Sequence, residues 1–191
     1  MSLAADVQRL SSKEQPDDKQ RACAAMPEKR FDDLGVSGSR GEEPITVVIA
    51  EDNEDDITLL ESALAAIACK NTIRIVRDGQ ELLDYLRGEG KYADRRAYPF
   101  PNVLLLDIKM PRVSGLDVLR WLNSHPECSV MPTVVFSASD LDEDVALAYE
   151  LGANAYFVKP MTFQSLKDIL RSMFEFWGKC TKPPLPQKCA D

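Results

Sequence analysis

Acidic side chains stand directly after two apolar segments of the sequence, where each segment gives way to polar residues. Glu51 and Asp52 follow the segment ITVVIA, and Asp107 follows the aliphatic run VLLL that begins at Val103. Carboxylates that are brought together repel one another and resist ionising unless a cation joins them. Mg²⁺ suits such hard oxygen ligands, because it takes one or two carboxylates, keeps several waters and commonly bridges to a phosphate. These acids therefore predict a divalent-metal site.

A hydroxyl and a lysine end two later apolar segments in the same way. Ser137 ends TVVFS, and Lys159 follows YFV with Pro160 next. A metal-bound phosphoryl group needs a cation and a hydroxyl donor opposite the metal, and these two side chains supply both. A carboxylate can serve as the nucleophile that takes up the phosphoryl group. Together the residues predict phosphoryl transfer to or from an aspartate.

Single residues of this set also have ordinary structural explanations. Lys159 alone could be a salt-bridge partner, and Ser137 alone could be a satisfied hydroxyl at a strand end. In EDNEDD, the acids Glu54, Asp55 and Asp56 are interpreted as acids that favour a helix N-terminus. Only the joint placement of the set makes the functional interpretation the stronger one.

Strands and helices must alternate to position these residues. The predicted strands are ITVVIA (45–50), TIRIV (72–76), NVLLLD (102–107), PTVVFS (132–137) and NAYFV (154–158). Helically spaced apolar residues follow each strand, and the predicted N-caps are Asn53, Asp78 with Glu81, Ser114 with Asp117, Asp140 with Glu143, and Thr162. Strands joined through helices need right-handed crossovers, so the fold is predicted as α/β: a doubly wound, three-layer (βα)5 sandwich with a five-stranded parallel sheet, flavodoxin-like. The carboxyl ends of its strands meet at one edge.

Three segments are distinguished by composition. Residues 1–43 lack sustained periodicity and are predicted to be a disordered extension, residues 44–178 the folded domain, and residues 179–191 a flexible tail containing proline and lysine. Within the domain, the polar connection 88–101 is longer than the others, and it is either a surface excursion or functional.

Charge and cysteine usage exclude several classes. Residues 44–178 carry 13 basic and 21 acidic side chains, which argues against nucleic-acid binding. No apolar run is long enough for a membrane span and no signal peptide is apparent, so a cytoplasmic location is expected. The five cysteines form no CxxC pair and there is one histidine, so scattered reduced thiols are favoured over a zinc site or a disulfide framework.

The motifs AEDNEDD, LLLDIKMPRVSG, TVVFSAS and YFVKP, in this order and spacing, closely resemble the receiver domains of two-component response regulators, which have the CheY-like fold. The resemblance covers the chain from about Ile45 to Trp177. It implies that Asp107 accepts a phosphoryl group from a phosphohistidine on a sensor histidine kinase or phosphotransfer protein. Such a protein signals through its partners and is not an enzyme in the ordinary sense, although it takes part in its own phosphoryl transfer and dephosphorylation.

The same resemblance implies roles for the other site residues. Mg²⁺, or Mn²⁺, is expected to be bound by Asp52 directly, by Glu51 through water, by Asp107 and by the backbone carbonyl of Lys109. Ser137 and Lys159 are expected to contact phosphoryl oxygens, with Tyr156 turning in on activation. Lys109 and Ser139 occupy the positions that tune the phosphoryl lifetime, and the Lys159–Pro160 peptide bond is expected to be cis. The family usually has two aspartates where Glu51 and Asp52 stand, and often a threonine in place of Ser137.

The segments GEGKYADRR, NSHPECSVMP and FEFW resemble the stand-alone regulators that serve phytochrome-type sensor kinases. The predicted output surface covers about residues 141–177. The last helix carries more apolar residues than one core-facing stripe needs, which favours a homodimer through this end: Leu166, Ile169, Leu170, Met173, Phe174, Phe176 and Trp177.

Two alternatives remain. A degenerate receiver could act as an adaptor without phosphorylation, because sequence cannot show flux through the site. A phosphohydrolase of the haloacid dehalogenase type also uses Asp, Ser or Thr, Lys and Mg²⁺. That family has its nucleophile on the first strand in a DxDx pattern, whereas here the apolar run leads to Asp107 on the third strand, so this alternative is disfavoured.

Overall fold

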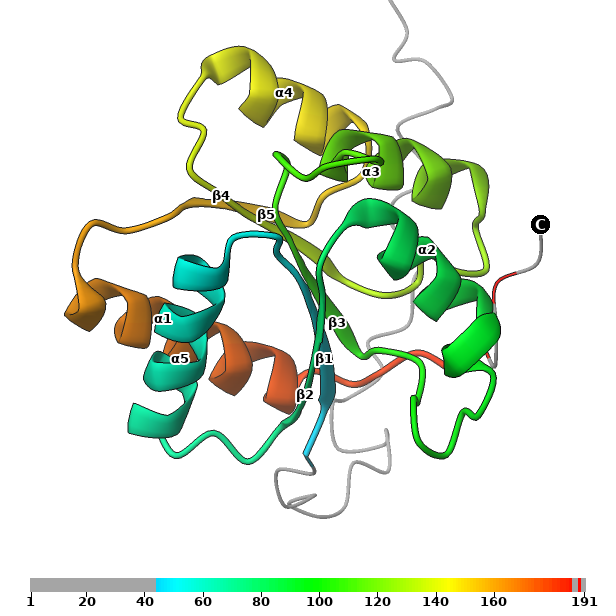
Figure 1. Cartoon of the computed structure of the whole chain (residues 1–191), viewed down its shortest axis with the longest axis horizontal. Helices are drawn as coiled ribbons and strands as arrows, with labels where there is room; N and C mark the ends of the chain where they lie inside the picture. Colours follow the sequence, from blue (N-terminus) through cyan, green and yellow to red (C-terminus); the bar gives the residue numbers. More distant parts are fainter. Residues whose placement is uncertain (1–43, 187–188, 190–191) are drawn as a thin grey trace, which may run out of the picture. The chain divides into compact units, whose positions relative to one another are not determined.

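The computed structural model describes residues 44–186 and residue 189, so the prediction for residues 1–43 lies outside the described residues. Strands and helices alternate along this part of the chain (Figure 1). The strands are β1 (Thr46–Ala50), β2 (Thr72–Val76), β3 (Val103–Leu106), β4 (Thr133–Ser137) and β5 (Ala155–Val158). The helices are α1 (Glu54–Ala66), α2 (Gly79–Arg87), the 3-10 helix η3 (Gly90–Tyr92), α3 (Gly115–Ser124), α4 (Asp142–Glu150) and α5 (Phe163–Lys179). Among these described helices, none is long and apolar enough to cross a membrane.

The strands form one parallel sheet in the order β2-β1-β3-β4-β5. The predicted doubly wound α/β fold is therefore confirmed. Because all five strands run in the same direction, their carboxyl ends meet at one edge of the sheet. β3 lies at the centre, between β1 and β4, so the residue after β3 has neighbours from both flanking strands.

The run VLLL forms the central strand β3, and all four side chains are at most 1% exposed. Val103 and Leu105 face one apolar core, and Leu104 and Leu106 face the other. This alternation is the period of two expected of a strand covered on both faces. Burying each aliphatic side chain contributes roughly 1.5–3 kcal/mol, so β3 is a stable support for the residue that follows it.

Helices cover both faces of the sheet (Figure 1). α1 and α5 pack on one face, while α2, α3 and α4 lie on the other. Most of the surplus apolar residues predicted on α5 belong to the core between α1 and the sheet: Leu166, Leu170, Met173 and Phe174 are buried. Phe176 is the strongly exposed member of that group, at 60%. The surplus is therefore smaller than the sequence suggests, because α5 packs against both α1 and the sheet.

Side-chain caps begin four of the five α-helices, as predicted. These caps are Asn53, Asp78, Ser114 and Thr162. The predicted cap of α4 by Asp140 and Glu143 is wrong, because α4 begins after Leu141 without a side-chain cap. The hydroxyl of Ser139 donates to the Asp144 carboxylate instead, which ties the start of α4 to the end of β4. At the other end of α4, Gly152 has φ 97°, the left-handed conformation that favours glycine just after a helix.

The long connection after α2 is an ordered excursion that returns to the helix. The Tyr85 hydroxyl donates to the carbonyl of Pro99 at 2.8 Å, and its ring packs against those of Tyr92 and Tyr98. Arg95 donates to the carbonyls of Tyr85 and Leu86 at 2.7 and 2.6 Å. These contacts satisfy carbonyls of the last turn of α2, which have no partners within the helix.

Glu81 joins the start of α2 to this connection. Its carboxylate accepts from the Arg77 backbone amide, the Lys91 ammonium and the Tyr92 hydroxyl, each at 2.7 Å. Burial opposes ionisation, but these hydrogen bonds outweigh it and lower the pKa of Glu81 to about 2. The charged form of Glu81 is therefore stabilised by folding.

We expect Glu81→Gln to lower the free energy of unfolding by about 1–2 kcal/mol at about pH 7, after allowance for partial exposure of the group. A depressed pKa contributes stability above the unfolded value of 4.5 and loses it as the pH falls towards about 2. Urea unfolding of both proteins at about pH 7 and about pH 2.5 measures the difference. The exposed Glu61→Gln is the control, and a pH-independent difference for Glu81→Gln contradicts the prediction.

A disulfide joins Cys128, in the turn after α3, to Cys189 in the tail. The prediction of scattered reduced thiols is therefore wrong for this pair, whereas Cys69 and Cys180 have free thiols. The two half-cystines are 61 residues apart, and their spacing along the chain carries no sign of the pairing. The fold brings them together.

Candidate functional site

Asp107 lies directly after β3, and backbone groups hold both its amide and its carboxylate. Its amide donates to the Ala50 carbonyl at 3.0 Å, and its Oδ1 accepts from the Lys109 amide at 3.2 Å. The residue is 6% exposed. The first residue of α3, Gly115, packs so closely on the Asp107 carbonyl that a Cβ atom built there would lie 2.1 Å from the oxygen. The strand and α3 therefore fix the position of this carboxylate together.

The Lys159 ammonium joins three acids from different elements. Its Nζ donates to Glu51 Oε2, Asp56 Oδ2 and Asp107 Oδ2, each at 2.7 Å. The lysine side chain is 14% exposed and those of Glu51 and Asp107 are 2% and 7% exposed. Little solvent screens these pairs, so the ammonium is the main source of positive charge for the buried carboxylates.

Glu51, Asp52 and Asp107 can each offer one oxygen to a common point, since the three oxygens lie within 4.8 Å of one another. Glu51 and Asp107 are buried, and Asp52 is exposed at the mouth of the site. A set of three hard oxygen donors, with one side open to water, fits the preferences of Mg²⁺ or Mn²⁺. The structure thus brings together the side-chain ligands that the sequence predicts.

The environment of Glu51 and Lys159 shifts the pKa values of both groups. Burial raises the pKa of Glu51, although Lys159 acts in the opposite direction. Burial also acts to lower the pKa of Lys159, but its hydrogen bonds to Asp107, Asp56 and Glu51 outweigh this and raise it. The lysine therefore stays charged, and a second cation nearby would favour the ionised form of Glu51.

Asp56 is the site residue that sequence reasoning missed. It was assigned only to the N-terminus of α1, but its carboxylate contacts Lys159 and is 38% exposed. A helical side chain leans back towards the helix N-terminus, and the N-terminus of α1 follows the end of β1. The side chain at the third position of α1 therefore points at the site. This direction is the feature of the sequence from which Asp56 can be predicted to be a site residue.

Ser137, Ser139 and Tyr156 form a connected group beside the acids. Ser137 ends β4 and is fully buried, and its Oγ accepts from the Ser139 amide at 3.4 Å. The half-buried Tyr156 donates its hydroxyl to the Ser139 carbonyl at 2.9 Å. Burial raises the pKa of Tyr156, so this hydroxyl keeps its proton at neutral pH. Lys109 is exposed beside Asp107.

The Lys159–Pro160 peptide bond is trans, as are the other peptide bonds of the described residues, so the prediction of a cis bond is wrong for this structure. Trans is favoured before proline by about 0.5–1 kcal/mol. The Lys159 side chain reaches all three carboxylates with the bond in this form, and its amide donates to the Ser137 carbonyl at 2.8 Å.

The comparisons with known proteins agree with this fold. The family model of the response regulator receiver domain matches residues 47–171. The chain belongs to this family, whose members are signalling proteins of two-component systems.

Within the family, the chain is similar to regulators associated with phytochromes. The response regulator RPA3017, described in red light signalling of R. palustris, is 34% identical with a TM-score of 0.70, covering 74% of this chain and 99% of that one. The phosphorylated cyanobacterial phytochrome response regulator RcpA is 34% identical with a TM-score of 0.68, covering 74% and 100%. Response regulator Rcp1 of Synechocystis sp. is 29% identical, covering 70% of this chain and 89% of that protein. The predicted resemblance to phytochrome-type regulators is confirmed.

Proposed function

We propose that this receiver takes up a phosphoryl group on Asp107 from a phosphohistidine of a sensor histidine kinase or phosphotransfer protein, in a reaction that needs Mg²⁺. The observation that carries the proposal is the setting of Asp107. It is a nearly buried carboxylate that contacts the Lys159 ammonium at 2.7 Å and shares a donor cluster with Glu51 and Asp52. Kinases of the phytochrome type are the proposed source, because the similar regulators carry that description.

The donor set fits the proposed metal. Glu51, Asp52 and Asp107 would hold Mg²⁺ or Mn²⁺ through side-chain oxygens, and Lys109 through its backbone carbonyl. A structure of response regulator Rcp1 is described as its Mn²⁺-bound form, which supports a divalent ion in this family. When bound, such an ion neutralises the charge of the acids and of the phosphoryl oxygens.

The residues of the chain perform the rest of the transfer. A carboxylate oxygen of Asp107 forms the bond to phosphorus while the phosphorus–nitrogen bond of the donor histidine breaks. Lys159 and Ser137 hold oxygens of the transferred group, which keeps phosphorus in line with the attacking oxygen. Lys109, exposed beside Asp107, and Ser139, bonded to Asp144, tune how readily water later reaches the phosphoryl group.

Signalling follows from the added charge. The aspartyl phosphate carries a charge of roughly −1.5 to −2 where the Asp107 carboxylate carried about −1, and it brings three acceptor oxygens. The Ser137 hydroxyl then turns towards these oxygens, and Tyr156 leaves the Ser139 carbonyl and moves inward behind it. Because Tyr156 is on β5, next to α4 and α5, the change reaches the surface formed by residues 141–177 and alters its protein contacts.

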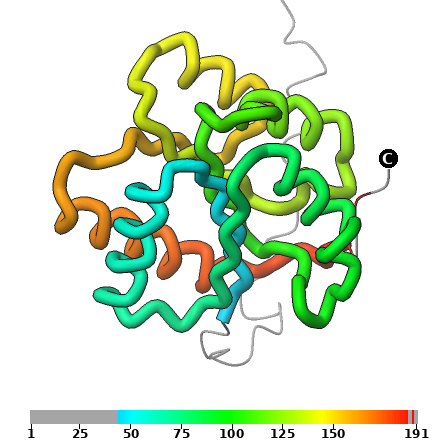
Figure 2. The backbone as a smooth tube through the Cα atoms, in the orientation of Figure 1, coloured from blue at the N-terminus to red at the C-terminus, as the bar shows by residue number. Residues whose placement is uncertain are grey.

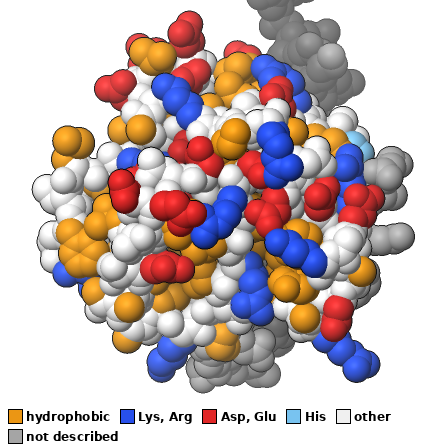
Figure 3. Space-filling view, in the orientation of Figure 1, with side chains coloured by type: hydrophobic (Ala, Val, Ile, Leu, Met, Phe, Trp, Pro, Cys, Tyr) orange, Lys and Arg blue, Asp and Glu red, His pale blue; other side chains and the backbone are white. Residues whose placement is uncertain are grey.

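This surface is also our proposed homodimer contact. Its exposed apolar side chains are Leu141, Tyr149, Val158, Met161, Phe163 and Phe176. Hydrophobic side chains gather at the left edge of Figure 3, where α5 begins. Sedimentation with and without a phosphoryl mimic tests the proposed dimer. A monomer at high micromolar concentration in both states contradicts this proposal.

We propose a cytoplasmic location and no binding of nucleic acid or membrane.

Incubation with acetyl phosphate and Mg²⁺, followed by intact mass, tests the proposed function. We expect one phosphoryl group on the wild type and none on Asp107→Asn, because the substitution removes the nucleophilic oxygen. The exposed Asp168→Asn is the matched control and should be modified like the wild type, and EDTA should abolish the modification.

The other outcomes of this experiment would point to the two alternatives. Absence of an adduct on the wild type, even with a cognate kinase, supports an adaptor that works unphosphorylated. Multiple turnover of phosphate esters supports a hydrolase.

A further inference from the structure

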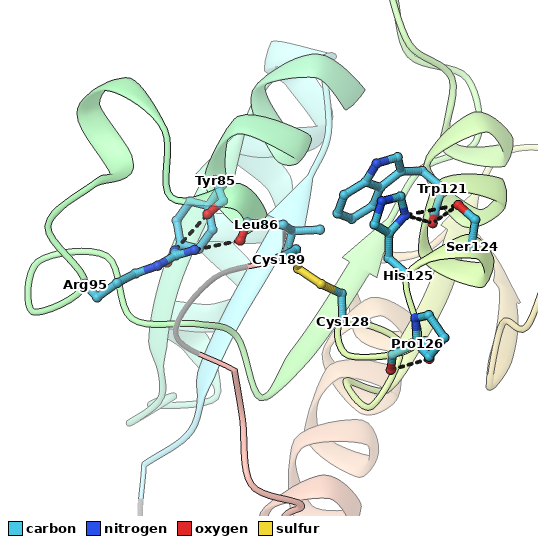
Figure 4. Close-up of a disulfide and its surroundings, with 10 residues drawn as sticks. Tyr85, Leu86, Arg95, Trp121, Ser124, His125, Pro126, Cys128 and Cys189 are labelled. Atoms are coloured by element: carbon cyan, nitrogen blue, oxygen red, sulfur yellow. Dashed lines mark hydrogen bonds between the residues drawn. A yellow bond between two sulfur atoms is a disulfide. The ribbon is translucent and has the colours of Figure 1, made fainter. Parts of the chain in front are cut away.

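The cysteine pair Cys128 and Cys189 is a second chemical centre, separate from the acidic site. Cys128 is fully buried and Cys189 is 3% exposed. Their Cα atoms are 5.8 Å apart, within the usual range of about 4.4–6.8 Å for bonded cysteines. Figure 4 shows the disulfide between Leu86 of α2 and the turn that follows α3, with Trp121 and His125 alongside. This centre is built into the layer of α2 and α3.

The tail is also held there by contacts that do not depend on sulfur. The Cys189 amide donates to the Leu86 carbonyl at 3.1 Å. That carbonyl also accepts from Arg95, so the connection after α2 and the tail meet at one point (Figure 4). Leu185 packs against the same apolar core. These contacts position Cys189 next to Cys128 independently of the bond between the two sulfur atoms.

The tail crosses from one layer of the domain to the other. Its described part leaves α5, which packs with α1, and Cys189 lies against α2 and the turn after α3 (Figure 2). The turn that holds Cys128 connects α3 with β4. α3 begins at Gly115 against the Asp107 carbonyl, and β4 ends at Ser137. The disulfide thus attaches the tail to the connection between two elements that carry the site.

We propose that Cys128 and Cys189 form a reversible thiol–disulfide exchange site for a small thiol or disulfide of the glutathione type, which attaches or releases the C-terminal tail. The proposal rests on the proposed function in one respect: a receiver phosphorylated by a cytoplasmic kinase works where thiols are kept reduced. Disulfides in that compartment are usually transient and redox-sensing. A disulfide between two buried cysteines is then a state that the protein enters and leaves.

The exchange balances with glutathione as the co-reactant. The Cys189 thiolate attacks oxidised glutathione, forms a mixed disulfide and releases one glutathione. The Cys128 thiolate then attacks the Cys189 sulfur and releases the second. Two protein thiols are oxidised, one small disulfide is reduced, and the two thiol protons end on the released glutathiones. Cys189 reacts first because it belongs to the tail, which can leave its docking contact, whereas Cys128 belongs to a buried turn.

The test uses the full chain with Cys23, Cys69 and Cys180 changed to serine, so that only the proposed pair remains. The protein is equilibrated in glutathione buffers of graded oxidation, its free thiols are alkylated, and the intact mass is measured. We expect a monomeric disulfide at oxidising ratios and two free thiols at reducing ratios. Adding Cys128→Ser should instead accumulate one glutathione per chain on Cys189, since the second step is then blocked.

A matched control moves the second thiol within the same tail. A chain that keeps Cys128 and Cys180 but has Cys189→Ser should form no internal disulfide, because Cys180 is at the end of α5 and lacks the Leu86 contact. Hydrogen exchange of the peptide that contains Cys189 should be slower in the oxidised protein than in the reduced one, because the disulfide holds the Cys189 amide on the Leu86 carbonyl.

Several results overturn the proposal. Free thiols at every ratio, a disulfide that forms between two chains, or a disulfide that reducing buffer cannot open each contradict it. Equal pairing of Cys180 and Cys189 with Cys128 also contradicts it, since docking would then play no part. Asp107→Asn should form the disulfide normally, so a failure of phosphoryl acceptance and a failure of this exchange are measured separately.

Discussion

Replacing Lys159 with methionine should lower the free energy of unfolding by about 3–5 kcal/mol at neutral pH without Mg²⁺. The substitution keeps much of the side-chain volume and removes the ammonium. Glu51 and Asp107, whose side chains are 2% and 7% exposed, then lose the positive charge 2.7 Å away. Buried carboxylates without a counter-ion are costly, and here two of them also repel each other.

Acid and metal should both reduce this loss. Burial raises the pKa of Glu51 already in the wild type, and removal of Lys159 takes away the group that opposes the rise. A buried acid with a raised pKa binds more protons folded than unfolded, so stability falls as the pH rises. The deficit of Lys159→Met should therefore shrink as the pH falls from neutral towards the unfolded value of 4.5. Mg²⁺ binds only the folded chain and should restore stability as its concentration increases.

The same variant should bind Mg²⁺ more tightly and yet accept the phosphoryl group poorly. Without Lys159, no ammonium competes for Glu51 and Asp107, but none remains to hold a phosphoryl oxygen either. Urea unfolding with graded Mg²⁺ and acetyl phosphate labelling measure the two effects. Lys70→Met, at an exposed position, is the control and should change stability by less than about 0.5 kcal/mol. If the wild type and Lys159→Met bind Mg²⁺ with equal affinity, Lys159 and Mg²⁺ do not compete for Glu51 and Asp107.

Repulsion among the acids also explains why Asp56 contacts the lysine. A bound metal ion would compete with Lys159 for Glu51 and Asp107, and Asp56 would then remain as a partner of the lysine. Asp56→Asn should lower the free energy of unfolding less than Lys159→Met does. The Asp56 side chain is 38% exposed, so water replaces part of its contact with Lys159.

Local patterns in the sequence were sufficient for the sheet and for most of the site. The run VLLL has the length and hydrophobicity of a strand covered on both faces, and the caps at Asn53, Asp78 and Ser114 mark where helices begin. Once the strands are parallel, topology alone gathers the residues that follow them. Glu51, Asp107 and Lys159 could therefore be placed at one edge without any knowledge of side-chain contacts.

The features that were missed depend on distances across the fold. Asp56 contacts a lysine directly after the fifth strand, and Cys189 reaches a turn 61 residues earlier. No periodicity within a segment records such pairs. The failure of the cap expected at Asp140 is a local matter: the Ser139 hydroxyl donates to the Asp144 carboxylate across the start of α4. Propensity favours an acid at Asp140, but it does not show which neighbouring side chains bond to each other.

Changing Gly115 to alanine should lower the free energy of unfolding by about 3 kcal/mol, at the upper end of what overpacking costs. A Cβ at this position would lie 2.1 Å from the Asp107 carbonyl oxygen and 2.9 Å from the Ile108 Cα atom. Both are backbone atoms that cannot rotate away. α3 must therefore move off the end of β3, and the turn that positions the Asp107 carboxylate must move with it.

Because of this displacement, Gly115→Ala should also slow phosphoryl acceptance from acetyl phosphate, although it changes no group that contacts the phosphoryl. Gly178→Ala is the matched control: apart from its own helix turn and chain neighbours, no atom of the described residues lies within 4 Å of the added Cβ, and the position lies inside α5. There the substitution should raise stability by up to about 1 kcal/mol, because alanine loses less conformational entropy than glycine in a helix. Urea unfolding and the rate of phosphoryl acceptance from acetyl phosphate are measured for Gly115→Ala and Gly178→Ala. If both glycines respond alike, close packing of α3 on Asp107 does not hold the phosphoacceptor in place.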